Sequence, residues 1–544
     1  MDLSCVCWML FLCAISVVKA GDTFIAAVVE PVTSEVLSSI NKESALKVIN
    51  KNLNHFEELI QTASQQKARI IVFPEYGITG FGQTRNTAPY FGEKVPNPYM
   101  SSVIPCTNVQ FNNTTILKKL SCLAIKNNII IVANVISVEP CQVDAPCPPD
   151  GQFIYNTDVA FASNGQLVAR YHKMKVYADE KEIFDSGFGL DNYGVFKTDF
   201  GTIGLFTCFD ILFPYPAIDL VYGVGVDIMA FPTAWMNELP LLSAVEYQEA
   251  WAIHYNTTLL ASNQHLPIVK MTGSGIYNGQ IGALTYHYDM VTYRSKLLIV
   301  DVPNHRSTNI VPEVRNKIIS ELKAMDKHSL ERVSPVLRAL LDEDNQQQQE
   351  DNQQQQKYMN GDHNKFLQND GTKNNQKTTH QDNTTFQGIL NDDMYTFQPL
   401  TGASGQISIC NGTICCHLDF TRREKSSYEL YALGAFDGLH THNGQYYLQT
   451  CSLVRCQVNE GTKCGGEIET ATEIFQNISL GITGYNSKVH LFPEIVTNKV
   501  NLAVIGKEWI SEFPYDHIRT VENGIENPLL AANIYGRWYE KDSI

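Results

Sequence analysis

The chain has 544 residues, of which 44% are hydrophobic and 18% charged, and its formal net charge is −16. The length allows about two to four domains, and the balance of residues is that of a soluble globular protein, which excludes a membrane-spanning or wholly disordered chain. The acidic charge and the lack of a Lys/Arg cluster exclude nucleic acid and anionic membrane surfaces, so a small molecule is the expected partner.

The N-terminal segment 2–20, DLSCVCWMLFLCAISVVKA, is one apolar run that ends in small residues. This pattern predicts a secretory signal peptide over residues 1–20, and hence a secreted, extracellular protein. Asp2 stands where such a peptide usually carries a positive charge, so an uncleaved signal anchor stays open as an alternative. No other apolar run of about 18 residues and no hydrophobic C-terminal tail occurs, so we expect no membrane anchor.

Sequons of the type N-x-S/T agree with passage through the secretory pathway, where such asparagines acquire glycans. The candidate glycosylation sites are Asn112, Asn113, Asn256, Asn383, Asn411 and Asn477. Because sequons also occur by chance, their number supports the compartment more than any single site does.

The first elements alternate between apolar strands and helices. Residues 22–30 predict a buried strand, residues 35–65 show helical spacing of apolar residues, and residues 68–73 predict a strand that ends at Pro74. Further strands, with a helix at 242–255 among them, are predicted over residues 127–138, 157–173, 201–208, 226–235 and 257–265. This alternation predicts an α/β domain with a buried sheet over residues 21–330.

The composition changes abruptly at residues 343–386, which contain NQQQQEDNQQQQ and few aliphatic residues. Such a segment buries too little apolar area to offset the entropy of ordering, so it is predicted to be a disordered linker. Over residues 387–544, short alternating runs such as YYLQTCSLVRCQV return together with turn residues and six cysteines. They predict a smaller, β-rich C-terminal domain that disulfides stabilise.

The positions of the 14 cysteines distinguish Cys208 from the others. Three lie in the predicted signal peptide, and the remaining eleven are an odd number, which leaves at least one thiol free or intermolecular in an oxidising compartment. Ten of them cluster along the sequence: Cys106 with Cys122, Cys141 with Cys147, Cys410 with Cys415 and Cys416, and Cys451 with Cys456 and Cys464. Cys208 has no such neighbour. On counting alone, a buried structural thiol is its more ordinary interpretation.

Three strand ends carry reactive groups: Glu75 in FPEYG, Lys173 in YHKMK and Cys208 in FTCFD. Taken singly, each has an ordinary explanation as a solvated loop charge or a core thiol. Together they meet the needs of a cysteine amidohydrolase, in which a carboxylate takes the thiol proton and later returns it to the leaving amine. Lys173 and the backbone N–H of Phe209 would stabilise the oxyanion of the tetrahedral intermediate. This chemistry requires no cofactor and no metal.

Other assignments stay open at this point. Lys175 lies two residues beyond the candidate lysine and would share its face of a strand, so spacing does not choose between them. His172 and His254 are available as bases for a Cys–His arrangement, although neither has the flanking sequence of a known protease type. Metal sites are not expected, because no CxxC pair occurs and His440 and His442 in HTHNG are interpreted as a polar turn.

Longer motifs extend beyond these residues. FPEYGITGFG, ARYHK, GTIGLFTCFDILFPYPA, VDIMAFPTAWMNELPLLSAVEYQEAWA and KMTGSGIY resemble the carbon-nitrogen hydrolase (nitrilase) superfamily, in particular its vanin and biotinidase branch of secreted amidases. ICCHLDF, YALGAFDGLHT and YGRWYEKD are similar to the second domain that only this branch carries. The resemblance covers nearly the whole mature chain except residues 343–386.

The resemblance implies a four-layer α-β-β-α sandwich and a Glu-Lys-Cys triad, carried here onto Glu75, Lys173 and Cys208. The motif YHK selects Lys173 as the triad lysine. Many members have a second glutamate shortly after that lysine, a position that Glu180 fits, with Glu182 a close rival. The family substrates are pantetheine, cleaved to pantothenate and cysteamine, and biotin amides such as biocytin.

Tyr76 departs from the family pattern, because this chain reads FPEY where vertebrate members read FPED. The residue adjoins the expected base, so the departure puts the substrate specificity in doubt. The first expectation is a secreted pantetheine hydrolase, and a biotin-amide hydrolase is the alternative within the enzymes. A catalytically inactive secreted glycoprotein that binds a ligand through the same fold is the alternative from another class.

Overall fold

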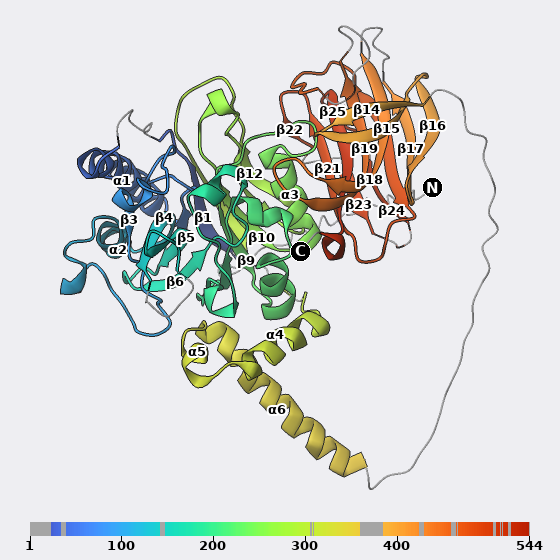
Figure 1. Cartoon of the computed structure of the whole chain (residues 1–544). Helices are drawn as coiled ribbons and strands as arrows, with labels where there is room; N and C mark the ends of the chain where they lie inside the picture. The colour runs from blue at the N-terminus through green and yellow to red at the C-terminus, as the bar shows by residue number, and fades with distance from the viewer. Residues whose placement is uncertain are drawn as a thin grey trace, which may run out of the picture.

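The computed structural model describes residues 23–33, 40–141, 147–304, 307, 309–358, 385–423, 429–457, 464, 466–503, 507–511, 513, 515–520 and 524–542. The predicted signal peptide and Asn383 lie outside these ranges. Figure 1 shows two bodies side by side, one coloured blue to green and the other orange to red, with yellow helices projecting below the first. No helix in the described ranges combines the length and the hydropathy needed to cross a membrane.

The N-terminal body contains two sheets that pack face to face. The first has the order β13 (Lys296–Pro303), β1 (Thr23–Glu30), β2 (Ile70–Val72), β4 (Ile130–Pro140), β5 (Gln152–Phe161) and β6 (Leu167–His172), with β3 (Gly92–Glu93) beside β4. The second has the order β12 (Gly282–His287), β11 (Ser274–Asn278), β10 (Thr258–Ser262), β9 (Ile228–Pro232), β8 (Thr202–Leu205) and β7 (Val195–Lys197). The central strands of both sheets are parallel, which explains their continuous apolar runs.

Helices cover the outer faces of both sheets. On the first sheet lie α1 (Lys42–Gln65) and α2 (Ile116–Asn127). The side chain of Asn41 caps α1 by accepting from the backbone of Ser44 at 3.0 Å, and the apolar face of the helix is buried, with Phe56 stacked on Phe73. On the second sheet lies α3 (Ala244–Tyr255). The α-β-β-α sandwich expected from the sequence is therefore confirmed.

Helix α3 is enclosed on both sides. All but two of its residues are buried, because β21 (His490–Thr497) of the C-terminal body packs on the face that points away from the second sheet. This explains why its sequence, AVEYQEAWAIHY, is not the one-sided pattern of a surface helix. The two bodies therefore share one continuous core.

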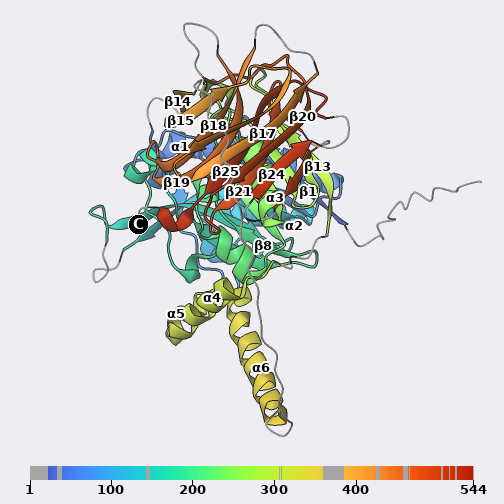
Figure 2. The same ribbon diagram turned by 90° about the vertical axis from the view of Figure 1, so that its right-hand side faces the viewer.

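The C-terminal body is a sandwich of two antiparallel sheets, as the sequence predicted. One sheet has the order β14 (Phe386–Leu390), β15 (Asp393–Pro399), β18 (Leu430–His440), β19 (Tyr446–Cys456), β25 (Leu529–Arg537), β21 (His490–Thr497) and β22 (Asn501–Leu502). The other has the order β16 (Ser404–Asn411), β17 (Ile414–Arg422), β20 (Phe475–Thr483), β24 (Tyr515–Thr520) and β23 (Lys507–Ile510). Figure 2 shows these strands in front of the N-terminal body.

Three helices follow the N-terminal body: α4 (Pro312–Ala324), α5 (Lys327–Glu331) and α6 (Pro335–Tyr358). Leu337 and Leu340 bury the start of α6, which then projects away from the body. The disordered linker expected from residue 343 is therefore wrong for its first part, since residues 343–358 are helical. The glutamines that lower the apolar content of this segment are good helix formers, and the buried first turn gives them a helix to extend. Residues 359–384 lie outside the described part of the chain.

Arg537, the last residue of β25, ties the two bodies together. Its fully buried guanidinium donates to the backbone oxygen of Leu212 at 2.9 Å and to that of Tyr447 at 2.7 Å. The carboxylate of Asp542 neutralises the guanidinium at 2.7 Å. An arginine buried with a paired carboxylate and satisfied donors is a rigid connection, because removing either partner leaves a buried charge.

Candidate active site

Cys208 lies where the second sheet ends. It follows β8 and begins a short 3-10 helix, Cys208–Leu212, with a backbone φ of 48°. Positive φ is uncommon for a residue with a side chain, and such conformations occur at functional sites. The side chain is 8% exposed and is the free cysteine of the described residues. The isolated thiol found by counting is thus buried but reaches a cavity.

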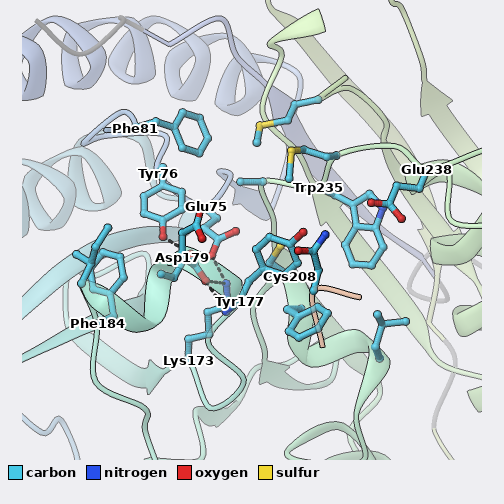
Figure 3. Close-up of a pocket in the computed structure, with 18 of the residues that line it drawn as sticks. Glu75, Tyr76, Phe81, Lys173, Tyr177, Asp179, Phe184, Cys208, Trp235 and Glu238 are labelled. Atoms are coloured by element: carbon cyan, nitrogen blue, oxygen red, sulfur yellow. Dashed lines mark hydrogen bonds and ion pairs between the residues drawn. The ribbon is translucent and has the colours of Figure 1, made fainter. Parts of the chain in front are cut away.

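The structure brings the three expected strand-end residues together (Figure 3). Glu75 follows β2, and Lys173 directly follows β6. The Lys173 ammonium lies 2.8 Å from Glu75 Oε1, and both side chains are 1% exposed. The Cys208 thiol lies beside them and interacts with the Glu75 carboxylate. Sheet edges from two different sheets therefore supply one site.

Glu180 is the second glutamate of this site, and Glu182 is not. Glu180 Oε2 accepts from Lys173 Nζ at 2.7 Å and from the backbone N–H of Tyr177 at 2.9 Å. Glu182 is exposed, two residues further along the same 3-10 helix, Ala178–Glu182. Lys175 points elsewhere, with its ammonium 4.7 Å from the centre of the Phe213 ring. The geometry thus places Glu180 and Lys173 in the site, and it places their alternatives Glu182 and Lys175 outside it.

Tyr76 completes the set of side chains around Glu180. Its hydroxyl donates a short hydrogen bond to Glu180 Oε1, and its backbone has a φ of 58°. The ring is 7% exposed and packs against Phe81 and Phe184. The residue that departs from the family pattern therefore contacts both the polar centre and the apolar wall of the site.

Buried polar side chains on β4 and β5 support the carboxylates, and sequence reasoning missed them. Asn156 donates to Glu75 Oε1 at 2.7 Å. Asn134 donates to Asn156 at 2.7 Å and to Asp158 at 2.8 Å, and Asp158 accepts from Thr207, the residue before the nucleophile, at 2.7 Å. Polar residues within otherwise apolar strands are a signal for such a network, and residues 156 and 158 share one face of β5.

The charges inside the site shift its pKa values. Burial raises the pKa of Glu75, which Lys173 opposes and Glu180 reinforces. Burial alone would lower the pKa of Lys173, but the charges of Glu180 and Glu75 hold it well above its ordinary value. Burial and the charge of Glu75 raise the pKa of the Cys208 thiol. The resting site therefore holds a neutral thiol beside a carboxylate base, with a charged ammonium between two carboxylates.

The two candidate histidine bases lie elsewhere. His172 is bonded to Thr157 at 2.8 Å and stacks on Tyr155. His254 lies 3.0 Å from His490 of the C-terminal body. Burial lowers the pKa of each to about 4. Neither lines the cavity in front of Cys208, so the Cys–His arrangement is not formed.

A cavity of about 240 Å³ opens in front of the nucleophile, and the C-terminal body forms part of its wall. The lining residues from this body lie at the end of β18, in the turn that follows and at the start of β19: His440, His442, Asn443 and Tyr446. The polar turn expected for His440 is wrong: the residue is 3% exposed and its Nδ1 lies 2.8 Å from Asp393. Sequence could not show this pairing, because β15 and β18 become neighbours only in the folded sheet.

Comparisons with known proteins agree with this geometry. The carbon-nitrogen hydrolase model matches residues 45–258, and the vanin C-terminal domain model matches residues 384–542. The chain is 38% identical to the pantetheinase of Bos taurus over 540 residues, which cover 98% of this chain and 93% of that protein. It is 35% identical to the biotinidase of Homo sapiens over 554 residues, which cover 98% and 95%.

This chain belongs to the carbon-nitrogen hydrolase family. Within the family it belongs with the pantetheinases and biotinidases, since the similarity extends through the vanin C-terminal domain. The pantetheinase of Homo sapiens is similarly close, at 37% identity over 536 residues that cover 97% of this chain and 91% of that protein. Membership makes the protein a hydrolase of carbon–nitrogen bonds.

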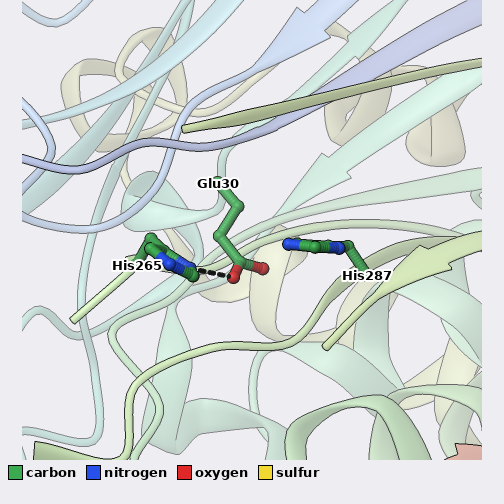
Figure 4. A group of neighbouring side chains, drawn as sticks. All are labelled: Glu30, His265 and His287. Carbon is green, nitrogen blue, oxygen red and sulfur yellow. Dashed lines mark hydrogen bonds and ion pairs between the residues drawn. The ribbon is translucent and has the colours of Figure 1, made fainter. Parts of the chain in front are cut away.

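A second polar cluster of this carbon-nitrogen hydrolase lies outside the cavity lining (Figure 4). The ligand atoms of Glu30, His265 and His287 lie within 4.8 Å of one another, the spacing of a metal site. His265, however, is bonded through Nδ1 to Glu30 at 2.7 Å and through Nε2 to the backbone oxygen of Thr292 at 2.6 Å. The Glu30 carboxylate also accepts from Gly273 N at 3.0 Å. Glu30 and His265 are thus hydrogen-bonded to each other and to neighbouring protein atoms.

The structure describes the surroundings of the expected oxyanion donor and of five of the candidate glycan sites. Phe209, whose N–H is the expected donor, is buried and packs against Tyr177 with ring centres 5.1 Å apart. Asn112 and Asn113 are exposed, as a glycan requires. Asn411 is partly buried and its Nδ2 donates to Thr396 at 2.9 Å, so a glycan there would break a hydrogen bond. Asn256 and Asn477 are partly buried.

Proposed function

We propose that this hydrolase cleaves pantetheine, a linear amide, to pantothenate and cysteamine through a thioester on Cys208. The observation that carries the proposal is the Lys173 ammonium held between Glu75 and Glu180 beside a free thiol in a cavity. This arrangement supplies a base, a cation and a nucleophile without a cofactor.

The first half-reaction begins with proton transfer. Glu75 takes the thiol proton of Cys208 as the sulfur attacks the amide carbonyl carbon, forming a C–S bond and an oxyanion. Lys173 and the backbone N–H of Phe209 stabilise that oxyanion. Glu75 then gives its proton to the amide nitrogen, the C–N bond breaks, and the amine leaves. The raised pKa of Glu75 suits the first of these steps, because the carboxylate of a weaker acid is a stronger base and accepts the thiol proton more readily.

The second half-reaction hydrolyses the thioester. Glu75 takes a proton from water as the hydroxide adds to the thioester carbonyl, and Lys173 stabilises the second oxyanion. The C–S bond then breaks, the sulfur recovers the proton from Glu75, and the carboxylic acid leaves. Glu180 acts through Lys173, whose ammonium it holds at 2.7 Å.

Biotin amides such as biocytin are the second candidate substrate. The relatives named pantetheinase and biotinidase are nearly equally similar to this chain, at 38% and 35% identity. Tyr76 stands in the wall of the cavity, where it changes the space open to an acyl group. These facts support cleavage of an amide more strongly than they support a choice between the pantothenoyl and the biotinyl group.

The deciding experiment incubates the purified protein with pantetheine and with biocytin. Mass spectrometry would follow pantothenate or biotin, with Cys208→Ala as the matched control. We expect pantothenate release by the wild type and none by Cys208→Ala. Release from biocytin alone would favour the second candidate. No release from either, with Cys208 free but forming no acyl adduct, would favour the non-enzymatic binding glycoprotein.

We also propose that the protein works outside the cell. Five disulfides support an oxidising compartment: Cys106–Cys122, Cys141–Cys147, Cys410–Cys415, Cys416–Cys451 and Cys456–Cys464. Expression in cultured animal cells should place the protein, with glycans removable by an N-glycosidase, in the medium. Retention of all the protein inside the cells would contradict the proposal.

A further inference from the structure

Glu238 is a pocket residue that the proposed chemistry does not use. It lines the cavity next to Trp235, on the opposite side of Cys208 from Tyr76 and Phe81 (Figure 3). Tyr177 lines the same cavity, and burial together with the nearby Glu238 and Cys208 raises the pKa of its hydroxyl to about 12. Glu238 therefore faces the same small space as the nucleophile.

The backbone that carries Glu238 is held rigidly. Its N–H and C=O both bond to Leu242, at 3.2 and 2.8 Å. The neighbouring Asn237 is buried and donates to the backbone oxygens of Lys270 and Thr272. From the C-terminal body, Asn533 donates to the backbone oxygen of Pro240 at 2.9 Å. The carboxylate is thus presented from a fixed loop, as recognition of a ligand group requires.

The basic side chains around this part of the cavity already have carboxylate partners. Each lies close to a carboxylate other than Glu238: Lys173 to Glu75 and Glu180, His440 to Asp393, His442 to Asp392, and Lys270 to Glu467. Across the residues that the structure describes, no cation or N–H donor lies within ion-pair or hydrogen-bond distance of the Glu238 carboxylate. Glu238 therefore brings an unpaired negative charge into the cavity.

An unpaired, half-buried carboxylate is unfavourable unless something neutralises it. Burial raises the pKa of Glu238, and the charge of Asp392 adds to this, while His440 and His442 oppose it. A cation from a ligand would relieve the desolvation cost and would form a charge-assisted hydrogen bond. The enclosure of the site strengthens that bond, because few waters compete for the carboxylate.

We propose that Glu238 binds a primary ammonium group on the amine half of the amide substrate. The assignment to the amine half rests on the proposed function, because the pantothenoyl and biotinyl groups carry no cation. The preferred substrates of this chain are then amides of diamines or of lysine-like amines. In pantetheine the nitrogen of cysteamine is acylated, so the amine half ends in a neutral thiol. We therefore expect pantetheine to be cleaved less efficiently than a pantothenoyl amide that ends in an ammonium.

The test uses amides that differ only in the terminal group of the amine half. Pantothenoyl and biotinyl amides of ethylenediamine end in an ammonium, and the matching amides of ethanolamine end in a hydroxyl of similar size. We expect wild-type kcat/KM to be about 10- to 100-fold higher for the ammonium member, the scale of one hydrogen bond to a charged group. Glu238→Gln should remove this preference and leave hydroxyl-ended amides within about threefold of wild type.

Two further variants keep the test decisive. Glu238→Asp retains the charge and should retain part of the preference, which separates charge from folding. Glu313→Gln removes an equal charge at the exposed start of α4 and should change nothing. Equal rates for both amides in the wild type, or an equal loss for both in Glu238→Gln, would overturn the cation site while leaving amide hydrolysis intact. Failure of the wild type to cleave any of the amides, pantetheine or biocytin would overturn the proposed function as well.

Discussion

The two halves of the molecule use cysteine in opposite ways. In the C-terminal half six cysteines close three disulfides, two of them within a single hairpin or loop and one between β17 and β19. In the catalytic half one disulfide joins Cys106 to Cys122 of α2 and another joins Cys141 to Cys147, and Cys208 remains a thiol. Its cavity is lined by no second cysteine. A thiol can therefore stay reduced in an oxidising compartment, because the other cysteines that the structure describes are paired with one another and lie outside this cavity.

Buried charged residues also differ between the halves: one half has a cation paired with a carboxylate, and the other has a cation between two carboxylates. Arg422 and Glu473 of the C-terminal half form an ion pair at 2.9 Å, with both side chains at most 1% exposed. In the catalytic half Lys173 is shared by Glu75 and Glu180. When Glu75 takes up a proton, the ammonium still has a charged partner. Substitutions at Lys173 and its partners should thus change turnover, and substitutions at the Arg422–Glu473 pair should change stability.

The largest effect on turnover is expected from Lys173→Met. Loss of the ammonium removes oxyanion stabilisation, so turnover should fall by at least about 100-fold, the scale of one such donor. Lys175→Met is the matched control and should retain near-normal turnover, because that side chain lies over Phe213. Steady-state rates and circular dichroism of both variants would check this. Normal turnover in Lys173→Met would reassign the role to Lys175.

Tyr76→Phe should have a smaller effect of about tenfold on kcat, the scale of one hydrogen bond to a charged group. The variant keeps the ring against Phe81 and removes only the hydroxyl that holds Glu180. Tyr99→Phe is the control, since that buried hydroxyl bonds to the backbone of Tyr193 away from the cavity. Equal kcat losses in the two variants would mean that the effect comes from general destabilisation.

The pH profile should respond to the charge of Glu180. Glu75 must be ionised to accept the thiol proton, so kcat/KM should fall as pH decreases through its raised pKa, above the ordinary glutamate value of about 4.3. Glu180→Gln removes a charge that raises this pKa, so the midpoint of the acidic limb should move to lower pH. Rate profiles of the wild type and the variant would show the shift. A midpoint that moves upward would contradict the coupling.

Removing the Cys416–Cys451 disulfide should leave turnover unchanged. Replacing both cysteines with serine should lower the stability of the C-terminal half by about 2–4 kcal/mol, mainly by freeing the unfolded chain. The Cys141–Cys147 pair is the control, because it closes 6 residues instead of 35 and should cost less. Denaturant unfolding and rates at low temperature would separate the two quantities. A loss of turnover without a loss of stability would contradict this prediction, because it would mean that the disulfide affects the active site directly.

The layers and the triad could be predicted because their signals are local. Apolar runs ending in Glu75, Lys173 and Cys208 placed these residues at strand ends, and the strands then converge on one edge. Asn134 and Asn156 could not be found this way, since their roles depend on the pairing of β4 with β5. Helix α6 was hidden by a composition that also suits disorder. The sequence carries no signal for Glu238, because the cavity that it lines is formed by both bodies.

Because Arg537 lies near the end of the chain, the active site depends on a residue that is among the last to be synthesised. The guanidinium that fixes the backbone oxygen of Leu212, within the helix begun by the nucleophile, lies 325 residues later in the chain. A growing polypeptide therefore holds all three reactive side chains long before that helix is anchored. A chain ending before Leu529 should show no turnover in a rate assay, even with the triad present. Turnover should therefore begin only when the last strand has been made and Arg537 can reach Leu212.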